Sequence, residues 1–398
     1  MSSPYPRLFL KQGKEKSLRR FHPWVFSGAI QSMDGAPAEG DVVDVYSCEK
    51  QFLARGHYGP GSIAVKILTF QPEPVDQSFL QNRINCAAEL RKTLHLPRSN
   101  HTDAYRLINA EGDGLPGLIV DVYGATAVMQ FHSTGMRRCE SALAETLCNL
   151  GLSTVLASLP LHNDERLEGE DGKRIAVVRS SQNSPNLHPH IYEHGFRFEV
   201  DLEHGQKTGF FLDQRENRAL VRSFSSGRAV LNAFSYSGGF SVYALGGDAK
   251  QVHSVDSSRN AIELLKRNIK LNFPDSPNES YAADCFSFLK EMQDRYDLII
   301  LDPPAFVKHR SALKNATQGY RNINYLALRG IRPGGVLFTF SCSQLFSREM
   351  FRTVLFQSAA DTQRKIKILA ELGHAADHPV SIYHPEGEYL KGFVLRVD

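Results

Sequence analysis

The sequence predicts an α/β protein whose carboxyl-terminal half forms a doubly wound, mostly parallel sheet. From about residue 190, apolar strand-like runs and helical segments alternate at the spacing of βαβ units. The first 72 residues instead carry short alternating strands broken by turns, which indicates a small β-barrel. A chain of 398 residues with 42% hydrophobic content has room for two or three domains. We therefore expect a barrel at 1–72, an α+β region at 73–189 and the doubly wound domain at 190–398.

The first two regions are expected to contain short elements. Alternating apolar residues predict strands at 42–47, 51–58 and 62–70. The linker QPEPVD then precedes a helix expected over 78–94. The central region should continue with a hairpin around Gly112-Asp113-Gly114, a strand at 125–131, a helix at 138–149 and another strand.

The last region should supply the parallel strands. Four apolar runs predict strands at 228–234, 251–256, 296–302 and 334–340. Helices are expected at 258–271, with Ser257 or Ser258 as the cap, and at 348–363. Because ligands of such folds bind at the carboxyl ends of the strands, the residues after each strand are candidate site residues.

A small, glycine-containing turn follows the first of these strands, and such a turn lets a ligand approach the backbone. The full G-x-G-x-x-G pattern is absent, so a tight turn without a ligand is an equal alternative. Asp256, at the end of the next strand, can accept hydrogen bonds from ribose hydroxyls, which favours a nucleoside cofactor. The candidate positions are Asn232, Phe234, Ser235, Tyr236, Ser237, Gly238, Asp256 and Ser257.

Two later strand ends favour S-adenosylmethionine over NAD, although an NAD-dependent oxidoreductase stays open at this point. Asp284 stands where it would lie near an adenine amino group or cap the following helix. Asp302-Pro303-Pro304 follows the next strand, and its prolines hold the aspartate on a rigid extended segment suited to a flat base. Asp302 and Pro303 are also candidate contacts of the cofactor. A plain strand-terminating turn is the weaker alternative.

The strand at 334–340 leads into Ser341-Cys342-Ser343. A lone cysteine after an apolar strand is usually a buried hydrophobic residue, but this one lies at the tip next to Asp302. Carbon 5 of cytosine attacks a methyl group only after a thiolate has added at carbon 6, and Asp302 can hold the ring nitrogen. A thiol with an ordinary pKa of about 8.5 needs nearby positive charge or a base for this. We therefore expect Cys342 to be the nucleophile and Asp302 its partner, while the base that removes the carbon-5 proton is not identified.

Positive charge gathers near the amino end although the net charge is only +3. A basic run followed by the aromatic stretch FHPW is typical of phosphate contact, with a solvated loop as an equal alternative. The candidates for RNA contact are Lys11, Lys14, Lys16, Arg19, Arg20 and Trp24.

Other features set limits on the class of protein. No apolar run fits a signal peptide or a membrane span, so we expect a cytoplasmic protein that does not contact membranes. The six cysteines are scattered without a Cys-x-x-Cys pair, so neither a disulfide framework nor a metal site is expected.

Longer motifs resemble a known family: GQKTGFFLDQREN at 205–217, LNAFSYSGGFSVYAL at 231–245, SVDSS at 254–258, LDPPAFVK at 301–308, GYRNINYLAL at 319–328, VLFTFSCS at 336–343 and HPEGEYLKGF at 384–393. Together they are similar, over nearly the whole chain, to the ribosomal RNA large subunit methyltransferase I family, which methylates carbon 5 of a cytosine in 23S rRNA. The resemblance implies an amino-terminal PUA domain, a central α+β region and a Rossmann-like class I methyltransferase domain. It also implies S-adenosylmethionine as cofactor, 23S rRNA as partner and a homodimer.

By the same resemblance the segment 205–217 wraps the cofactor, with contacts expected from Lys207, Thr208, Phe211, Asp213, Gln214 and Arg215. The segment also fits a hairpin leading into a helix capped by Asp213, and both descriptions can hold.

One departure from related enzymes concerns release of the adduct. Enzymes with two cysteines carry the second just after the aspartate-proline pair, where this chain has Pro304 and Ala305. Another group must then act, and Tyr389 and Lys391 are candidates, although a packed edge strand accounts better for most of their segment.

Two further alternatives to the cytosine enzyme stay open. The first is an enzyme that methylates a nitrogen of guanine or adenine, in which Cys342 would be dispensable. The second is an RNA-binding protein with an inactive methyltransferase domain. The intact cofactor and cysteine motifs argue against that inactive form and against the NAD oxidoreductase.

Overall fold

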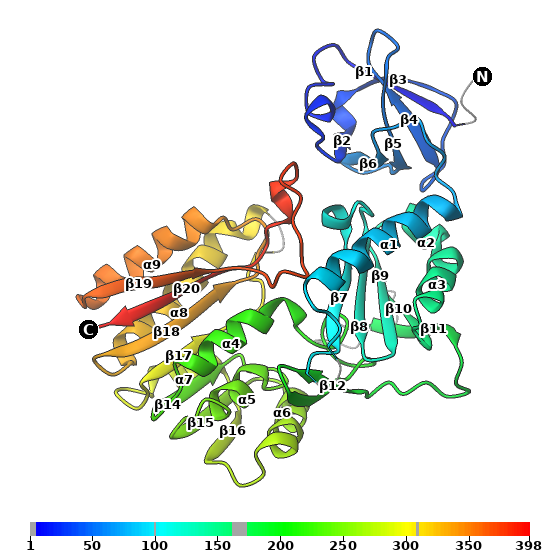
Figure 1. Ribbon diagram of the computed structural model, residues 1–398. Helices are drawn as coiled ribbons and strands as arrows, with labels where there is room; N and C mark the ends of the chain where they lie inside the picture. Colours follow the sequence, from blue (N-terminus) through cyan, green and yellow to red (C-terminus); the bar gives the residue numbers. More distant parts are fainter. Residues whose placement is uncertain (1–4, 99–100, 161–172, 308–309) are drawn as a thin grey trace. The chain divides into compact units, whose positions relative to one another are not determined.

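The computed structural model describes residues 5–98, 101–160, 173–307 and 310–398 (Figure 1). The chain forms two compact units, which we describe separately. The first unit contains residues 1–191, 200–210 and 376–387, and the second contains 192–199, 211–375 and 388–398. The amino-terminal and central regions thus share one compact unit, and the three-part division stays a prediction. No helix in the described part of the chain is long and apolar enough to cross a membrane.

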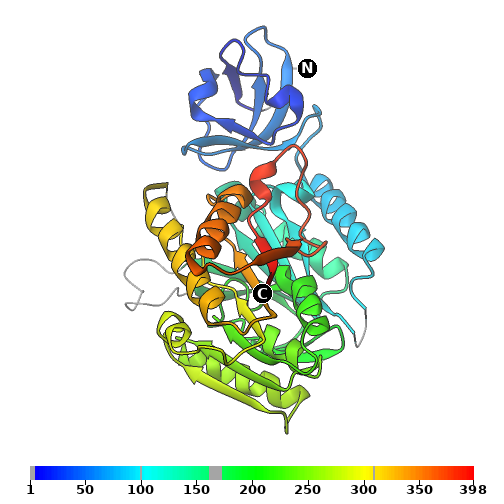
Figure 2. The same ribbon diagram turned by 90° about the vertical axis from the view of Figure 1, so that its left-hand side faces the viewer.

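The first unit begins with a curled six-stranded sheet of order β2-β6-β5-β4-β1-β3 (Figure 2). Its strands are β1 (Arg7–Leu10), β2 (Trp24–Phe26), β3 (Ile30–Asp34), β4 (Val42–Tyr46), β5 (Phe52–Tyr58) and β6 (Ile63–Thr69), with the 3₁₀ turns η1 (Leu18–Arg20) and η2 (Ser27–Ala29). Alternating side chains such as Val43, Val45 and Val65 fill its core. The three strands predicted from this alternation are confirmed as β4, β5 and β6.

The same unit continues with a five-stranded sheet of order β11-β10-β9-β8-β7. Its elements are α1 (Gln77–Thr93), β7 (Ala104–Asn109), η3 (Ala110–Asp113), β8 (Leu118–Tyr123), β9 (Thr126–Phe131), α2 (Thr134–Arg138), α3 (Glu140–Asn149), β10 (Thr154–Pro160) and β11 (Lys173–Ser180). Helix α1 begins after Asp76, whose side chain accepts a hydrogen bond from the Phe79 amide. The predicted hairpin is confirmed as β7 and β8, whereas the helix expected at 138–149 is two helices, because Ser133 caps an earlier start.

The second unit contains a seven-stranded sheet of order β16-β15-β14-β17-β18-β20-β19. Its strands are β14 (Ala229–Ala233), β15 (Gln251–Asp256), β16 (Asn278–Ala282), β17 (Leu298–Leu301), β18 (Gly335–Ser341), β19 (Ile366–Leu372) and β20 (Lys391–Val397). The first five of these strands are parallel to one another, which confirms the doubly wound, mostly parallel sheet. Strand β20 pairs antiparallel with both β18 and β19, so the expectation that the 384–393 segment forms an edge strand is wrong, and β19 is the edge.

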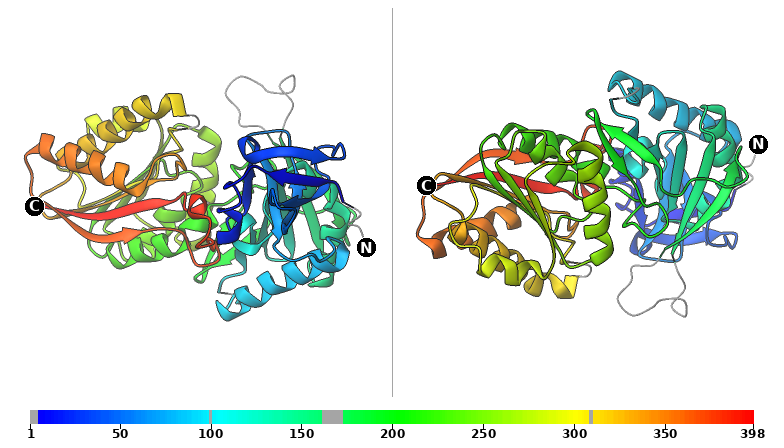
Figure 3. Two further views of the ribbon diagram at one scale, coloured as in Figure 1. Left: turned by 90° about the horizontal axis from the view of Figure 1, so that it is seen from above. Right: turned by 90° about the horizontal axis from the view of Figure 1, so that it is seen from below.

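Helices cover both faces of this sheet (Figure 3). They are α4 (Arg215–Ser223), α5 (Gly239–Leu245), α6 (Arg259–Asn272), α7 (Cys285–Lys290), α8 (Leu313–Gly330) and α9 (Arg348–Thr362). Helices α4, α5 and α6 pack together on one face, and α8 lies with α7 and α9 on the other. Ser258 caps α6 as predicted, since its side chain accepts a hydrogen bond from the Ala261 amide. The chain also forms a hairpin of β12 (His190–Glu193) and β13 (Phe196–Glu199). Its other 3₁₀ turns include η5 (Leu212–Gln214), η6 (Arg310–Ala312) and η7 (Pro385–Gly387).

Candidate active site

The carboxyl ends of four parallel strands meet at one edge of the second unit. The last residue of β14, Ala233, is in register with Val255 of β15 and with Leu301 of β17, and Leu301 is in register with Thr339 of β18. The Asp302 amide also donates a long hydrogen bond, 3.5 Å, to the Ala233 carbonyl. The segments that follow these strands are therefore neighbours, as the parallel topology requires.

The turn after β14 is held in an uncommon backbone conformation by Asp256. Phe234 and Tyr236 have φ of +61° and +44°, in the left-handed region that bulky residues rarely adopt. The Tyr236 amide donates to Oδ2 of Asp256 at 2.9 Å, and the Ser258 amide donates to Oδ1 at 2.9 Å. Asp256 thus fixes the turns after β14 and β15 together, which keeps the edge of the sheet in one shape.

Gly238 has a structural role at the end of this turn. Its φ is +83°, and a Cβ atom there would lie 2.6 Å from Cγ of Leu265 on α6. Backbone conformation and helix packing therefore both require a glycine here, and its contact with a cofactor stays a prediction.

The end of β14 also presents polar atoms that fit a nucleoside ligand. Oδ1 of Asn232 and Oγ of Ser235 are buried and have no hydrogen-bond partner among the described residues. Buried polar atoms without a partner are costly, and a bound ligand with hydroxyl and amino groups would satisfy them. The amide nitrogen of Asn232 is already used, since it donates to Ser241 at 2.8 Å. The Ser237 carbonyl likewise accepts from Asn268 at 3.0 Å.

Two other candidate positions are exposed. Asp284 caps α7, because its side chain accepts a hydrogen bond from the Ser287 amide at 2.8 Å. Its capping role is thus observed, and its contact with an adenine amino group stays a prediction. Ser257 is exposed beside Asp256 at the end of β15.

The segment 205–217 is divided between the two compact units. Lys207 and Thr208 belong to the first unit, where Lys207 has a φ of +50° and Thr208 is fully buried. The Thr208 hydroxyl donates to Asp121 at 2.5 Å and lies 2.9 Å from the Tyr123 hydroxyl. Asp121 is itself paired with Arg106 at 2.7 Å. Thr208 is thus anchored to a buried ion pair of the central region.

The remaining residues of this segment begin helix α4 in the second unit. The predicted hairpin is wrong, because residues 202–209 form turns, and Asp213 does not cap the helix. Asp213 is buried and accepts a hydrogen bond from the Tyr389 hydroxyl at 2.6 Å, so its carboxylate is directed to that side chain. The side-chain oxygen of Gln214, the residue before α4, accepts a hydrogen bond from Asn217 in the first turn of that helix. The half-buried ring of Phe211 packs edge-on against Tyr236, and buried Arg215 pairs with Glu216.

Cys342 lies directly after β18 and is half-buried. Its thiol donates to the carbonyl of buried Pro303 at 3.8 Å, which places the sulfur beside the Asp302-Pro303-Pro304 segment. The sequence predicted this pair of neighbouring strand tips, and the structure brings them together.

A buried polar network supports the backbone around Cys342. The Tyr320 hydroxyl on α8 lies 2.9 Å from both the Ser341 and the Ser343 hydroxyl oxygens. Lys391 is in register with Ser341 across β18 and β20, and its Nζ donates to the Ser343 carbonyl at 2.7 Å. These hydrogen bonds hold the residues directly before and after Cys342 in the sequence.

Lys391 is an unusual cation because it is 2% exposed. Burial lowers the pKa of its ammonium group to about 8, while the neighbouring Cys342 acts in the opposite direction. The sequence named Lys391 only as one of two candidates in its segment. The register of β18 with β20 places Lys391 opposite Ser341, the residue before the cysteine.

The basic residues expected to contact RNA lie in the segment between β1 and β2 of the first unit, and Trp24 begins β2. All five basic candidates are exposed, although Lys11 donates to the Gly28 carbonyl and Arg19 to Gln51. Trp24 is half-buried, and its indole N–H donates to Glu111 at 2.8 Å. Trp24 thus makes a structural contact between the barrel and the turn after β7, and its contact with RNA stays a prediction.

Comparison with known proteins identifies the family. Residues 180–354 match the model of the S-adenosylmethionine-dependent methyltransferase family, and residues 8–70 match the PUA-like domain. A ribosomal RNA large subunit methyltransferase I from Shigella boydii is 40% identical over 98% of this chain and 99% of its own length. The enzyme of that name from Escherichia coli O139:H28 has the same identity and coverage. This chain belongs to the ribosomal RNA large subunit methyltransferase I family.

Solved structures agree with this family at the level of the fold. A candidate S-adenosylmethionine-dependent methyltransferase from Streptococcus mutans matches with a TM-score of 0.83 at 22% identity, covering 98% of this chain and all of its own. A second structure, of a candidate methyltransferase with S-adenosylhomocysteine bound, matches with a TM-score of 0.84 at 22% identity over the same shares of both chains. The family model and the relatives identify S-adenosylmethionine as the cofactor of this enzyme. The alternative of an NAD-dependent oxidoreductase is therefore excluded.

Proposed function

We propose that this protein methylates carbon 5 of a cytosine in the 23S rRNA of the large ribosomal subunit, with Cys342 as the covalent nucleophile. The observation that carries the proposal is the Cys342 thiol, 3.8 Å from the Pro303 carbonyl at the neighbouring strand tip. The names of the curated relatives support ribosomal RNA as the substrate. A thiol beside a rigid Asp-Pro-Pro segment suits addition to a flat base held by Asp302.

The end of β14 and its neighbours fit the cofactor. Ser235 and Asn232 offer buried polar atoms, and Asp256 offers a carboxylate at the tip of β15. When bound there, S-adenosylmethionine supplies an electrophilic methyl group.

In the proposed reaction, the chain's residues prepare cytosine for that methyl group. The Cys342 thiolate bonds to carbon 6, and the displaced ring electrons make carbon 5 nucleophilic while Asp302 holds the ring nitrogen. After carbon 5 has gained the methyl group, a base removes its proton. The electrons of that C–H bond restore the ring double bond, the bond from sulfur to carbon 6 breaks, and Cys342 leaves as a thiolate.

Lys391 is our candidate for the positive charge that this thiolate requires. Its buried ammonium group is fixed one residue beyond Cys342 by the hydrogen bond to the Ser343 carbonyl. The other ionisable groups that act on Lys391 are Glu388 and Arg348, and these two form an ion pair of 2.8 Å with each other. An opposite charge within a few ångströms lowers the pKa of a thiol, so a cation in this position favours the nucleophilic form.

The decisive experiment measures methyl transfer from labelled S-adenosylmethionine to large-subunit rRNA that lacks the modification. We expect wild-type protein to yield 5-methylcytosine, located by mass spectrometry, and Cys342→Ala to yield none while binding the cofactor normally. Cys48→Ala, which changes an exposed cysteine of the first unit, is the matched control and should stay active. An active Cys342→Ala variant would contradict the covalent mechanism and favour methylation of a guanine or adenine nitrogen.

The basic run supports RNA binding by the first unit. Reversing the charges of Lys14, Lys16, Arg19 and Arg20 should weaken RNA binding and flatten its salt dependence, because each phosphate contact releases counterions. Unchanged binding would remove that assignment. We further propose that the protein acts in the cytoplasm and that it forms a homodimer. Sedimentation analysis of the full chain can test the homodimer.

A further inference from the structure

A hollow with a volume of about 250 Å³ lies within the first compact unit. Four parts of the chain line it: the barrel supplies Phe21 and Phe70, the turn after β7 supplies Glu111, the 376–387 segment supplies Tyr383, and helix α1 supplies one side chain. The side chain from α1 is Arg83. The volume is below the range of pockets that hold drug-sized ligands, so a single small ring system is the appropriate size of occupant.

Three aromatic rings form one side of this hollow. The Phe21 ring is 5.3 Å from the Phe70 ring, in an edge-to-face arrangement, and 5.3 Å from the Tyr383 ring. Phe21 and Tyr383 are nevertheless 50% and 51% exposed. Phe21 also has a φ of +62°, a conformation that is costly for a bulky residue and that is found preferentially at functional sites. The rings of Phe21 and Tyr383 are thus displayed at the surface, whereas Phe70 packs against the core of the barrel.

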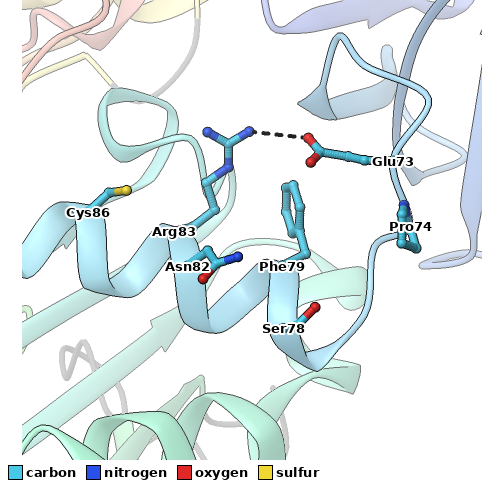
Figure 4. Close-up of a pocket in the computed structure, with 7 residues that line it drawn as sticks. All are labelled: Glu73, Pro74, Ser78, Phe79, Asn82, Arg83 and Cys86. Atoms are coloured by element: carbon cyan, nitrogen blue, oxygen red, sulfur yellow. Dashed lines mark ion pairs between the residues drawn. The ribbon is translucent and has the colours of Figure 1, made fainter.

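The polar wall suits a flat, neutral ligand with both donors and acceptors. The Arg83 guanidinium donates to the Leu68 carbonyl and lies 3.9 Å from Glu73, toward which it points in Figure 4. The Glu111 carboxylate accepts from Trp24 and has further acceptor capacity. A guanidinium and a carboxylate in one small hollow have opposite charges, so they do not favour a ligand of either charge. Together they match a nucleobase edge, which carries both hydrogen-bond donors and acceptors.

Positive charge lies immediately next to the rings. Arg19 and Arg20 directly precede Phe21 in the 3₁₀ turn η1, and both are exposed. A nucleotide whose base entered the hollow would carry a phosphate near these arginines. Stacking on aromatic rings together with nearby basic side chains is the usual way in which proteins hold single-stranded RNA.

We propose that this hollow binds one unstacked base of the RNA substrate, with Phe21 and Tyr383 as stacking surfaces and Arg19 and Arg20 on the adjoining phosphates. The inference rests on the proposed rRNA substrate, and it adds to the strand tips of the second unit a further base-binding site that belongs to the first unit alone. Its role is to grip RNA, and not to take part in methyl transfer.

The test compares ring removal with charge removal in the full-length protein, using a short single-stranded RNA of mixed sequence as the probe. We expect Phe21→Ala and Tyr383→Ala each to weaken binding about tenfold. The slope of affinity against salt should stay unchanged, because no charge is lost. Arg20→Ala should instead reduce that slope by about one. Phe21→Tyr, which keeps a ring, should bind as the wild type does.

A matched control removes an exposed ring elsewhere. Phe356 on α9 is 72% exposed, and Phe356→Ala should leave RNA affinity unchanged. A second measurement needs no variant: Trp24, the one tryptophan of the chain, is hydrogen-bonded to Glu111 in the wall of the hollow. Its fluorescence should change when RNA binds to the wild type and should stay constant with heparin, a polyanion that carries no bases.

Two results would overturn the inference. In the first, Phe21→Ala and Tyr383→Ala bind RNA with wild-type affinity, whereas Arg20→Ala binds RNA more weakly. This surface would then contact only phosphates, or the hollow would serve a protein partner. The other is an identical Trp24 response to RNA and heparin. Methylation of rRNA is assayed separately, so an active enzyme without the stacking effect refutes only this inference, whereas an inactive one refutes the proposed function.

Discussion

Replacing Lys391 by methionine should make the Cys342 thiol a weaker acid. Because the pKa of Lys391 is about 8, the side chain is still roughly nine-tenths protonated at pH 7 and supplies a positive charge. An opposite charge within a few ångströms shifts the pKa of an ionisable group by about 1 to 3 units. Removing the charge should therefore raise the pKa of Cys342 by at least about one unit and reduce its thiolate fraction at pH 7 about tenfold.

The assay is the rate of alkylation of Cys342 by iodoacetamide as a function of pH, followed by mass spectrometry of the Cys342 peptide. Lys391→Met should move the midpoint of this profile upward, and Lys391→Arg, which keeps the charge, should restore it. Lys367→Met is the matched control, since Lys367 is an exposed residue of β19 paired with Asp398. Profiles that coincide for the wild type and Lys391→Met would refute the reasoning, as would a wild-type midpoint at or above the ordinary value of about 8.5.

Three further predictions concern stability and are checked by denaturant unfolding. Gly135→Ala should cost about 1 to 3 kcal/mol, because the new Cβ would lie 2.2 Å from the His57 ring, whereas Gly61→Ala, with open space around it, should cost far less. Glu193→Gln should cost about 3 kcal/mol or more by leaving a buried guanidinium without its counter-charge, and Arg267→Ala, in an exposed pair, should cost under about 1 kcal/mol. Burial lowers the pKa of His57 to about 4, so the unfolded chain binds the extra proton between pH 4 and 6.5. Stability should therefore fall as the pH decreases through that window, and His57→Gln should flatten this dependence.

The elements that the sequence predicted best are those with a strong local pattern. Strands β4, β5 and β6 follow from alternation, and β14, β15, β17 and β18 from continuous apolar runs, because a strand buried on both faces has no polar face. The position of β20 was not predictable in this way. Its placement between β18 and β19 depends on pairing with residues that are distant in sequence.

The site was predictable to the extent that it depends on strand ends. Cys342 and Pro303 follow adjacent parallel strands, so the topology alone brings them together. The expectation that Asp213 caps α4 was wrong because a local capping pattern competes with a tertiary contact. The Asp213 carboxylate instead accepts a hydrogen bond from the Tyr389 hydroxyl. Lys391 could only be offered as one of two candidates, since its relation to the cysteine arises from the antiparallel register of β20 with β18.

Asp256 shows how one carboxylate can serve both the fold and a ligand. Each of its oxygens accepts one backbone N–H, from Tyr236 and from Ser258. A carboxylate has about four acceptor positions, so two remain for ribose hydroxyls. Because the same side chain holds the amide of Tyr236, a residue in the left-handed region, its removal would disturb the turn as well as the ligand contact. Ser235, whose hydroxyl has no partner among the described residues, is the position where the contribution of the cofactor can be separated from that of the fold.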